Sequence, residues 1–286
     1  MPISPTQQTI VNAMSVDVED YFQVSAFEKV IPRHAWDSLP CRVEHNTQRI
    51  IALFAQHGVK ATFFMLGWVA ERYPELVRTI IAEGHELASH GYGHERIGVM
   101  TPAAFRADVK KTKQLLEDLG GQAVQGYRAP SYSISRETLW AHAILHDEGY
   151  LYSSSVYPVR HDLYGIPDAP RFLYWVEAGQ FIEIPISTLA VRRYNLPIGG
   201  GGYFRLLPYA LSKRAIDYVN DVEGQPCVFY FHPWEIDPGQ PKQRNIKLKT
   251  RFRHYLNLGR MEHRLQHLLA DFHWDRMDKV YLKKAV

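Results

Sequence analysis

The sequence predicts an α/β fold in which helices cover a parallel sheet, arranged either as a barrel or as a doubly wound sheet. Short apolar segments alternate along the chain with amphipathic ones, and glycines stand where most of the amphipathic segments end. The chain has 286 residues, of which 46% are hydrophobic and 22% charged, so it can fill one large core. A single domain is therefore expected, with a catalytic barrel over about residues 10–238 and a C-terminal helical extension over about 239–286.

The expected strands are short runs of apolar and aromatic residues without helical spacing. They cover residues 10–18, 61–66, 85–89, 125–128, 181–186 and 227–231. The expected helices carry apolar residues three and four positions apart, often with proline in the first turn or glycine after the last. They cover residues 47–57, 74–83, 102–119, 136–147, 208–220 and 260–272.

Chemically reactive residues follow four of the expected strands. Asp17 lies at the end of the first, and His90, Arg128 and His232 follow three later ones. Because functional groups of such barrels sit at the C-terminal ends of the strands, these four side chains are expected to meet in one site.

Composition excludes several classes of function. The net charge of +3 does not indicate nucleic acid as a partner. Cys41 and Cys227 are far apart and are expected to stay free thiols, and no Cys-x-x-Cys is present for a cysteine zinc site. No secretory leader and no run near the ~18 apolar residues of a membrane span are found, so a soluble, cytoplasmic protein is expected.

Three acids close the first strand, Asp17, Glu19 and Asp20. Residues two apart in a strand face the same side, so Asp17 and Glu19 project together while Asp20 lies just beyond. Acidic clusters are most often solvated loops. Here an apolar strand delivers the acids to the open edge of the sheet, which favours a bound cation or a paired arginine.

Two His-x-x-x-His spacings occur, and only one favours a metal site. His90 and His94 follow a strand between glycines, where two imidazoles can reach one ion. His263 and His267 lie on the polar side of the last expected helix and are interpreted as solvated surface.

Arginine and histidine complete the candidate site. Arg128 can pair with Asp17 and orient it. His232 follows a buried strand beside Trp234 and can donate a proton from a partly apolar pocket, although such a histidine on its own is more often part of the core.

Taken in order, these segments resemble the polysaccharide deacetylase family, also called carbohydrate esterase family four or the NodB homology domain. The matching segments over residues 14–235 are DVED from Asp17, ATFFMLG from Ala61, His90 to His94, Arg128-Ala129-Pro130 and Phe231-His232-Pro233. Four further segments resemble the subfamily found with exosortase-linked exopolysaccharide loci. They are DVEDYFQVSAF, HDLYGIPDAPRF, GGGGYFRLLPY and RHYLNL.

The resemblance implies a distorted (β/α) barrel that hydrolyses N-acetyl groups of a sugar polymer or oligosaccharide with a divalent metal, most commonly zinc. Asp17 would be the general base, Arg128 would orient it and His232 would be the general acid. The metal would be held by His90, His94 and one carboxylate, with Glu19 favoured over Asp20. A backbone N–H near Ser131 or Tyr132 would stabilise the oxyanion.

The chain departs from the family pattern at the fourth motif. The family's aspartate that tunes the acid histidine is replaced by Tyr152-Ser153-Ser154-Ser155. Either another carboxylate takes its place, with Asp162 as the candidate, or His232 has no tuning carboxylate. The expected substrate contacts are Pro130, Tyr132, Tyr203, Arg205 and Trp234, with the segment Gly199 to Arg205 as a loop. Trp234 is interpreted as either core or a platform for a sugar ring.

Two other functions remain open from the sequence. Several members of the resembled family hydrolyse small amides or ureides, and some of these also space their acids as Asp-x-Asp, so a small substrate is one alternative. The serine-rich fourth motif keeps a second alternative, an inactive carbohydrate-binding or scaffold member. Retention of Asp17, both metal histidines, Arg128 and His232 argues against the latter, because binding alone needs no general base.

Overall fold

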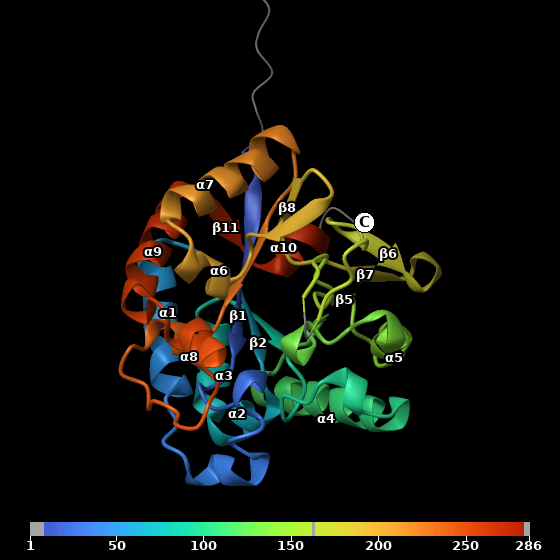
Figure 1. Ribbon diagram of the computed structural model, residues 1–286. Coiled ribbons are helices and arrows are strands. Elements are labelled where there is room, and N and C mark those ends of the chain that lie inside the picture. Colours follow the sequence, from blue (N-terminus) through green and yellow to red (C-terminus); the bar gives the residue numbers. More distant parts are fainter. Residues whose placement is uncertain (1–8, 162–163, 283–286) are drawn as a thin grey trace, which may run out of the picture.

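A computed structural model describes residues 9–161 and 164–282 (Figure 1). One sheet holds nine of its strands, in the order β10-β1-β2-β3-β4-β5-β7-β6, with β11 also paired to β1. All pairs are parallel except β6 with β7. The strands are β1 (Val11–Val18), β2 (Thr62–Met65), β3 (Glu86–Ser89), β4 (Gly126–Tyr127), β5 (Tyr152–Ser153), β6 (Tyr174–Val176), β7 (Phe181–Glu183), β10 (Val228–Phe231) and β11 (His273–Asp275).

The predicted α/β class is confirmed, and the sheet curls into a half-barrel. In the described part of the chain β10 and β6 end the sheet without pairing to each other, so the barrel stays open. In Figure 1, β1 and β2 lie at the centre, with α1 and α9 on one side and α4 and α5 on the other. The helices are α1 (Val43–Gln56), α2 (Gly67–Arg72), α3 (Pro74–Ala82), α4 (Pro102–Gly120), α5 (Ala141–Asp147), α6 (Gly201–Leu206), α7 (Tyr209–Asp217), α8 (Leu248–Tyr255), α9 (Leu258–Asp271) and α10 (Met277–Tyr281).

The central strands are buried on both faces, as parallel strands under helices must be. Val16, Phe63 and Leu87 lie in the main core, while Phe64 faces a second cluster across the sheet. Asp17 lies near the C-terminal end of β1, and Glu19, His90 and Arg128 come directly after β1, β3 and β4. The site therefore lies at the C-terminal ends of the strands.

The C-terminal residues are part of this sheet rather than an appended helical extension. His273 pairs with Val11 in register, and Met277 is fully buried behind the sheet. We expected the barrel to end near residue 238, but β11, which follows that point, pairs with β1 in the same sheet.

The segment predicted as a glycine loop is helical and tightly packed. A Cβ at Gly199 would collide with the Val228 carbonyl, one at Gly200 with the Tyr230 ring and one at Gly201 with the Glu235 carboxylate. Three successive glycines therefore let α6 begin directly against β10. A separate hairpin, β8 (Thr188–Val191) with β9 (Tyr194–Pro197), precedes it. None of the described helices has the length and apolar character needed to cross a membrane.

Candidate active site

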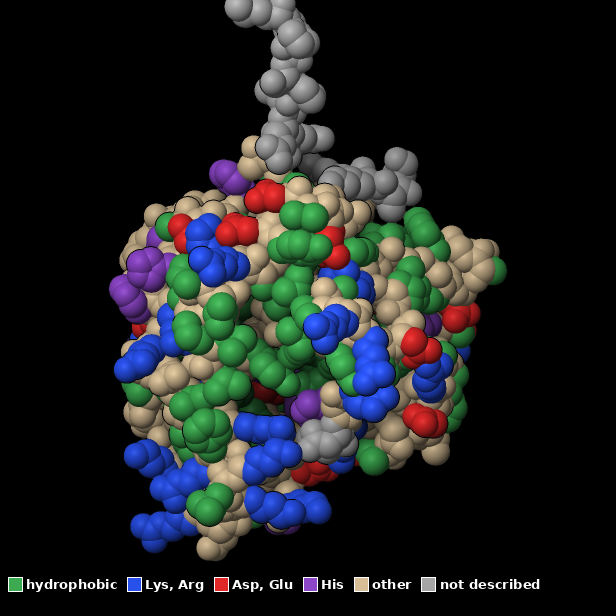
Figure 2. Space-filling model, turned by 45° about the horizontal axis from the view of Figure 1, so that its top comes forward, with side chains coloured by type: hydrophobic (Ala, Val, Ile, Leu, Met, Phe, Trp, Pro, Cys, Tyr) green, Lys and Arg blue, Asp and Glu red, His purple; other side chains and the backbone are tan. Residues whose placement is uncertain are grey.

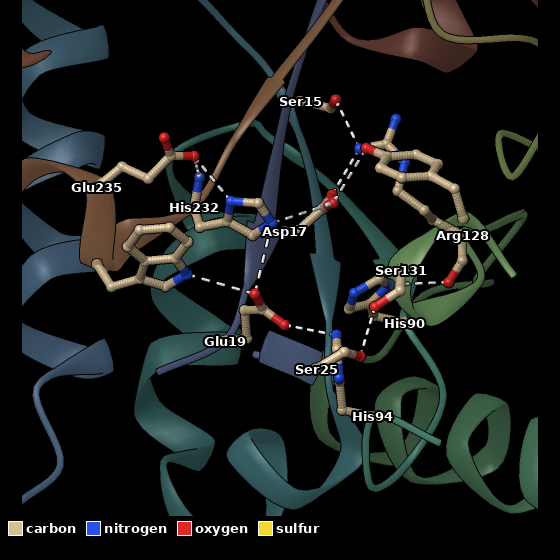
Figure 3. A network of polar contacts seen from close by, with 12 residues as sticks. Ser15, Asp17, Glu19, Ser25, His90, His94, Arg128, Ser131, His232 and Glu235 are labelled. Carbon is tan, nitrogen blue, oxygen red and sulfur yellow. Dashed lines mark hydrogen bonds and ion pairs between the residues drawn. The ribbon is translucent and has the colours of Figure 1, made fainter. Parts of the chain in front are cut away.

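Asp17 and Arg128 form a buried ion pair at the end of β1. Arg128 Nη1 lies 2.5 Å from Asp17 Oδ1, and their side chains are 0% and 2% exposed (Figure 3). Because one carboxylate oxygen is committed to the guanidinium, Oδ2 is the oxygen left toward Tyr132 and His232, at 3.4 Å and 4.0 Å.

Serines hold Arg128 in place. Nη1 also donates to Ser15 Oγ, while Nε and Nη2 donate to the carbonyl and hydroxyl oxygens of Ser154, and the guanidinium lies 4.0 Å from the Phe64 ring centre. The serine-rich fourth motif thus serves the arginine that orients Asp17. Spacing along the chain does not predict this contact, because Ser154 lies 26 residues after Arg128.

Glu19, His90 and His94 form a buried cluster whose candidate ligand atoms all lie within 4.8 Å of one another. Glu19 Oε2 is 2.7 Å from His94 Nε2. His90 Nδ1 lies 2.8 Å from the Arg128 carbonyl oxygen, which favours the tautomer that leaves Nε2 able to bind a metal. Ser25 and Ser131, joined through their hydroxyls at 2.6 Å, close the cluster on one side (Figure 3).

The donor set fits a divalent metal ion. Glu19 Oε2 is buried and, despite its closeness to His94, has no hydrogen-bond partner of correct geometry among the described residues. A buried carboxylate oxygen without such a partner is costly unless another group satisfies it. Two imidazoles and a carboxylate are a common ligand set for zinc.

Asp20 does not join this cluster. Its Oδ2 accepts hydrogen bonds from the backbone N–H groups of Arg42 and Val43 at the start of α1, and its Oδ1 accepts one from Tyr21. It therefore caps a helix. The geometry thus selects Glu19, not Asp20, as the carboxylate beside the histidines.

Electrostatics keep the cluster in the protonation state that a metal requires. Burial raises the pKa of Glu19, but His94 and His232 outweigh burial and lower the pKa to about 2. Burial lowers the pKa of His90 to about 4, against the opposing effect of Asp17. At neutral pH the cluster therefore offers a carboxylate and a neutral imidazole.

His232 faces the same cavity from the end of β10. Its Nε2 lies 3.4 Å from Glu19 Oε1, and its Nδ1 lies 2.8 Å from Glu235 Oε1. Burial lowers the pKa of His232, but Glu19 and the hydrogen bond to Glu235 outweigh it and raise the pKa to about 9. A side chain exposure of 19%, against 2% for Asp17 and Glu19, makes it the more open of these groups.

Glu235 is the site residue that the sequence analysis missed. Arg205 Nε donates to its Oε2 at 2.7 Å, and burial is outweighed by Arg205 and His232, which lower the pKa of Glu235 to about 2. The sequence His232-Pro233-Trp234-Glu235 could have predicted this contact. The two residues are three positions apart, so one helical turn brings the carboxylate next to the imidazole. Asp162, the expected tuning residue, lies outside the described residues.

Two expected substrate contacts are corrected by the structure. Arg205 is 2% exposed and binds Glu235 and backbone carbonyls of α8, so it cannot be presented to a substrate. Trp234 is 7% exposed and lies between the rings of His232 and His254, with centroids 5.2 and 4.2 Å away. Both indole faces are covered, which excludes an open sugar platform in this conformation.

Pro130, Tyr132 and Tyr203 lie where a substrate contact remains open to them. Tyr132 contacts Asp17 through its hydroxyl, whereas Pro130 is buried at the start of the same turn. Ser131 and Tyr132 both have left-handed backbones, with φ of 54° and 51°. Such strain in non-glycine residues clusters at functional sites. The Tyr132 N–H already donates to the Ala129 carbonyl oxygen.

A groove beside the site is rich in aromatic side chains. It encloses about 560 Å³, and Tyr164, Tyr194 and Tyr203 line it together with Arg160 and Arg193. Tyr164 connects this groove to the site, because its ring centre lies 6.0 Å from that of Tyr132, which contacts Asp17. Figure 2 shows a hollow on this face with acidic and histidine side chains at its base and apolar ones along its rim.

Two family models match successive parts of the chain. Residues 34–149 match the polysaccharide deacetylase model, and residues 154–282 match a domain of unknown function, DUF3473. The first region contains His90, His94 and Arg128 and the second contains His232, whereas Asp17 lies ahead of both.

Curated relatives match part of the chain. The chain is 38% identical over 96 residues to a peptidoglycan-N-acetylglucosamine deacetylase of Bacillus cereus, covering 33% of this chain and 35% of that protein. It is 32% identical over 113 residues to a peptidoglycan deacetylase of Helicobacter pylori (38% and 39%), and 36% identical over 72 residues to a chitooligosaccharide deacetylase of Rhizobium leguminosarum (25% and 34%). The chain thus spans little more than a third of these relatives' length.

Solved structures match the whole fold. A Mycobacterium smegmatis protein classed as a polysaccharide deacetylase superposes with a TM-score of 0.63 at 21% identity, over 99% of this chain and 94% of that one. The allantoinase Puue superposes with a TM-score of 0.58 at 15% identity, over 96% and 90%. At these identities the likeness establishes the fold alone.

Proposed function

We propose that this chain, which belongs to the polysaccharide deacetylase family, is a metal-dependent hydrolase that removes N-acetyl groups from amino sugars of a polysaccharide or oligosaccharide. The observation that carries the proposal is the meeting of three units at one edge of the sheet. They are an oriented carboxylate (Asp17 with Arg128), a candidate metal cluster (Glu19, His90 and His94) and a histidine with a raised pKa (His232).

Asp17 acts as the general base. Arg128 holds Oδ1, so Oδ2 is the oxygen that accepts the proton of the attacking water. Because Ser15 and Ser154 fix the guanidinium in turn, the carboxylate is oriented before the substrate arrives.

Glu19, His90 and His94 would hold the divalent ion, for which zinc is the best candidate. When bound, such an ion polarises the acetyl carbonyl and lowers the pKa of a coordinated water. The Ser131 N–H is the candidate backbone donor to the oxyanion, since the Tyr132 N–H is already used.

His232 donates the proton that allows the amine to leave. Glu235 holds Nδ1, which leaves Nε2 facing the cavity near Asp17 and Glu19. A pKa of about 9 keeps the imidazole charged at neutral pH, as a proton donor requires. An amine anion is too basic to depart unprotonated.

The aromatic groove favours a sugar chain as the substrate. Tyr194, which is 54% exposed, and Tyr203 can offer ring faces and hydroxyls along the groove, while Tyr164 is stacked on His161 and Tyr157. The peptidoglycan and chitooligosaccharide deacetylases among the relatives support this substrate class. The segments that resemble the exosortase-linked subfamily, together with the DUF3473 match, support a role in exopolysaccharide biosynthesis.

The test is acetate release from acetylated glucosamine oligomers by the zinc-loaded protein. Asp17→Asn should reduce kcat by about 10²–10⁴-fold, because the base is lost while Arg128 keeps its partner. Asp118→Asn, which changes an exposed aspartate on α4, is the matched control and should not alter kcat. Metal-loaded protein that cleaves small amides but no sugar oligomer would overturn the substrate class, and equal rates for both variants would overturn the role of Asp17.

A further inference from the structure

The segment ahead of α8 and the helix itself carry a dense positive charge. Residues 242–253 contain six lysines and arginines and no acid, although the whole chain has a net charge of only +3. The remaining residues therefore sum to −3. The small net charge of the whole chain therefore does not reveal how basic residues 242–253 are.

Large apolar side chains lie within the same charge cluster. Leu248 is 83% exposed and Phe252 is 57% exposed. They are four residues apart on α8 and so occupy one side of the helix, one turn from each other. We call the exposed set Lys242, Arg244, Lys247, Leu248, Arg251 and Phe252 the α8 surface.

The other side of α8 is anchored to the active site. His254 is buried and stacks on Trp234, which in turn stacks on His232. Arg205, the partner of Glu235, donates hydrogen bonds to the carbonyls of Arg253, His254 and Leu256. Figure 2 shows Lys and Arg side chains gathered below the hollow, among apolar ones.

We propose that the α8 surface docks on an anionic membrane, with Leu248 and Phe252 entering the boundary between headgroups and acyl chains. The lysines and arginines then lie over negatively charged headgroups. A helix with apolar residues outward among basic ones is the pattern of interfacial membrane binding.

The exposed apolar residues decide between a membrane and a soluble anionic polymer. A polymer would be bound by the charges alone and would leave Leu248 in water. A bilayer removes both side chains from water and so uses the whole surface. Membrane docking by α8 does not depend on which amide the active site cleaves.

Sedimentation with lipid vesicles tests the proposal in the full chain. The protein should bind vesicles of phosphatidylcholine mixed with phosphatidylglycerol and should not bind phosphatidylcholine alone. Arg244→Glu/Lys247→Glu should weaken binding at least about 20-fold at low salt, since each basic residue near such a surface contributes roughly fivefold. Leu248→Gln/Phe252→Gln should weaken it about tenfold or more at any salt concentration.

The matched control is Lys110→Glu/Lys279→Glu, which changes the net charge equally at exposed positions on α4 and α10. It should bind as the wild type does. Thermal unfolding of each variant separates a docking defect from a folding defect, and Arg244→Gln/Lys247→Gln serves if the reversal does not fold. Equal loss in the control would overturn the proposal. So would wild-type binding by Leu248→Gln/Phe252→Gln, which would indicate a soluble anionic polymer instead.

Discussion

The two His-x-x-x-His pairs of this chain have the same spacing and different surroundings. His90 and His94 are buried, and Glu19 Oε2 lies 2.7 Å from His94. His263 and His267 lie on α9, where their Nε2 atoms are 3.2 Å apart on an exposed surface. In the described part of the chain, the first pair is grouped with a carboxylate in a possible metal cluster and the second is not.

The difference shows that spacing brings two imidazoles together but does not make a site. The first pair has a strand end that supplies Glu19, a backbone carbonyl that orients His90, and a buried position for both imidazoles. The second pair has the Tyr209 ring 5.5 Å from His267, but in the described part of the chain it is not grouped with a carboxylate. Removing these supports one at a time should therefore reveal what each contributes.

The largest effect is expected from the histidines themselves. His94→Ala should abolish retention of one metal ion per chain and lower kcat by more than about 100-fold, because a ligand and its charge balance are both lost. His267→Ala should leave both unchanged, and its stability should change by no more than about 0.5 kcal/mol. Metal retention is measured as the metal content after dialysis, and kcat is measured from the release of acetate. Equal metal loss in both variants would contradict the distinction.

A smaller effect is expected from the carboxylate behind His232. Glu235→Gln should lower kcat about 10- to 100-fold. Since Glu235 raises the pKa of His232 toward about 9, its removal lowers that pKa, and the alkaline limb of the kcat–pH profile should move to lower pH.

Glu262→Gln provides the comparison on α9, beside the second histidine pair. Glu262 is 41% exposed and paired with Arg49, so its loss should cost at most about 1 kcal/mol and leave the pH profile in place. An alkaline limb unmoved by Glu235→Gln would show that Glu235 does not control the proton donor.

The smallest effect is expected from two adjacent glycines in α6. A Cβ at Gly201 would collide with the Glu235 carboxylate, whereas one at Gly202 meets nothing within 4 Å. Gly201→Ala should therefore destabilise the fold by about 1–3 kcal/mol and lower kcat about tenfold. Gly202→Ala should be neutral or stabilising by up to ~1 kcal/mol, since alanine favours a helix. Thermal unfolding and kcat distinguish the two, and identical behaviour would show that Glu235 is free to move.

The sequence predicted the fold class, the main strands and the meeting of strand-end residues, because periodicity and order along the chain report these directly. It also placed Asp17 and Glu19 on one face, which the alternation of side chains in β1 requires. Residue type alone gave a wrong prediction for side chains whose partners lie far away in the sequence. Arg205 looked like a substrate contact because its partners, Glu235 and the carbonyls of α8, lie 30 to 51 residues away.

Short or irregular strands also could not be predicted from the sequence. β11 has three residues and no apolar alternation, and it forms only because β1 offers it a free edge. The hairpin β8–β9 and the helix α6 likewise depend on packing against neighbours. Local preference carries little information in such segments.

The path from α8 through Arg205 and Glu235 to His232 also bears on how such a protein can diversify. Recombination could exchange only the segment that contains His90, His94 and Arg128. It would then leave behind Asp17 and Glu19, which precede this segment, and His232, which follows it. One that removed the chain after residue 240 would strip Arg205 of its carbonyl partners and β1 of β11. The unit that inheritance can pass on intact is therefore the entire sheet together with β11, and variation should concentrate in outward-facing parts such as the β8–β9 hairpin.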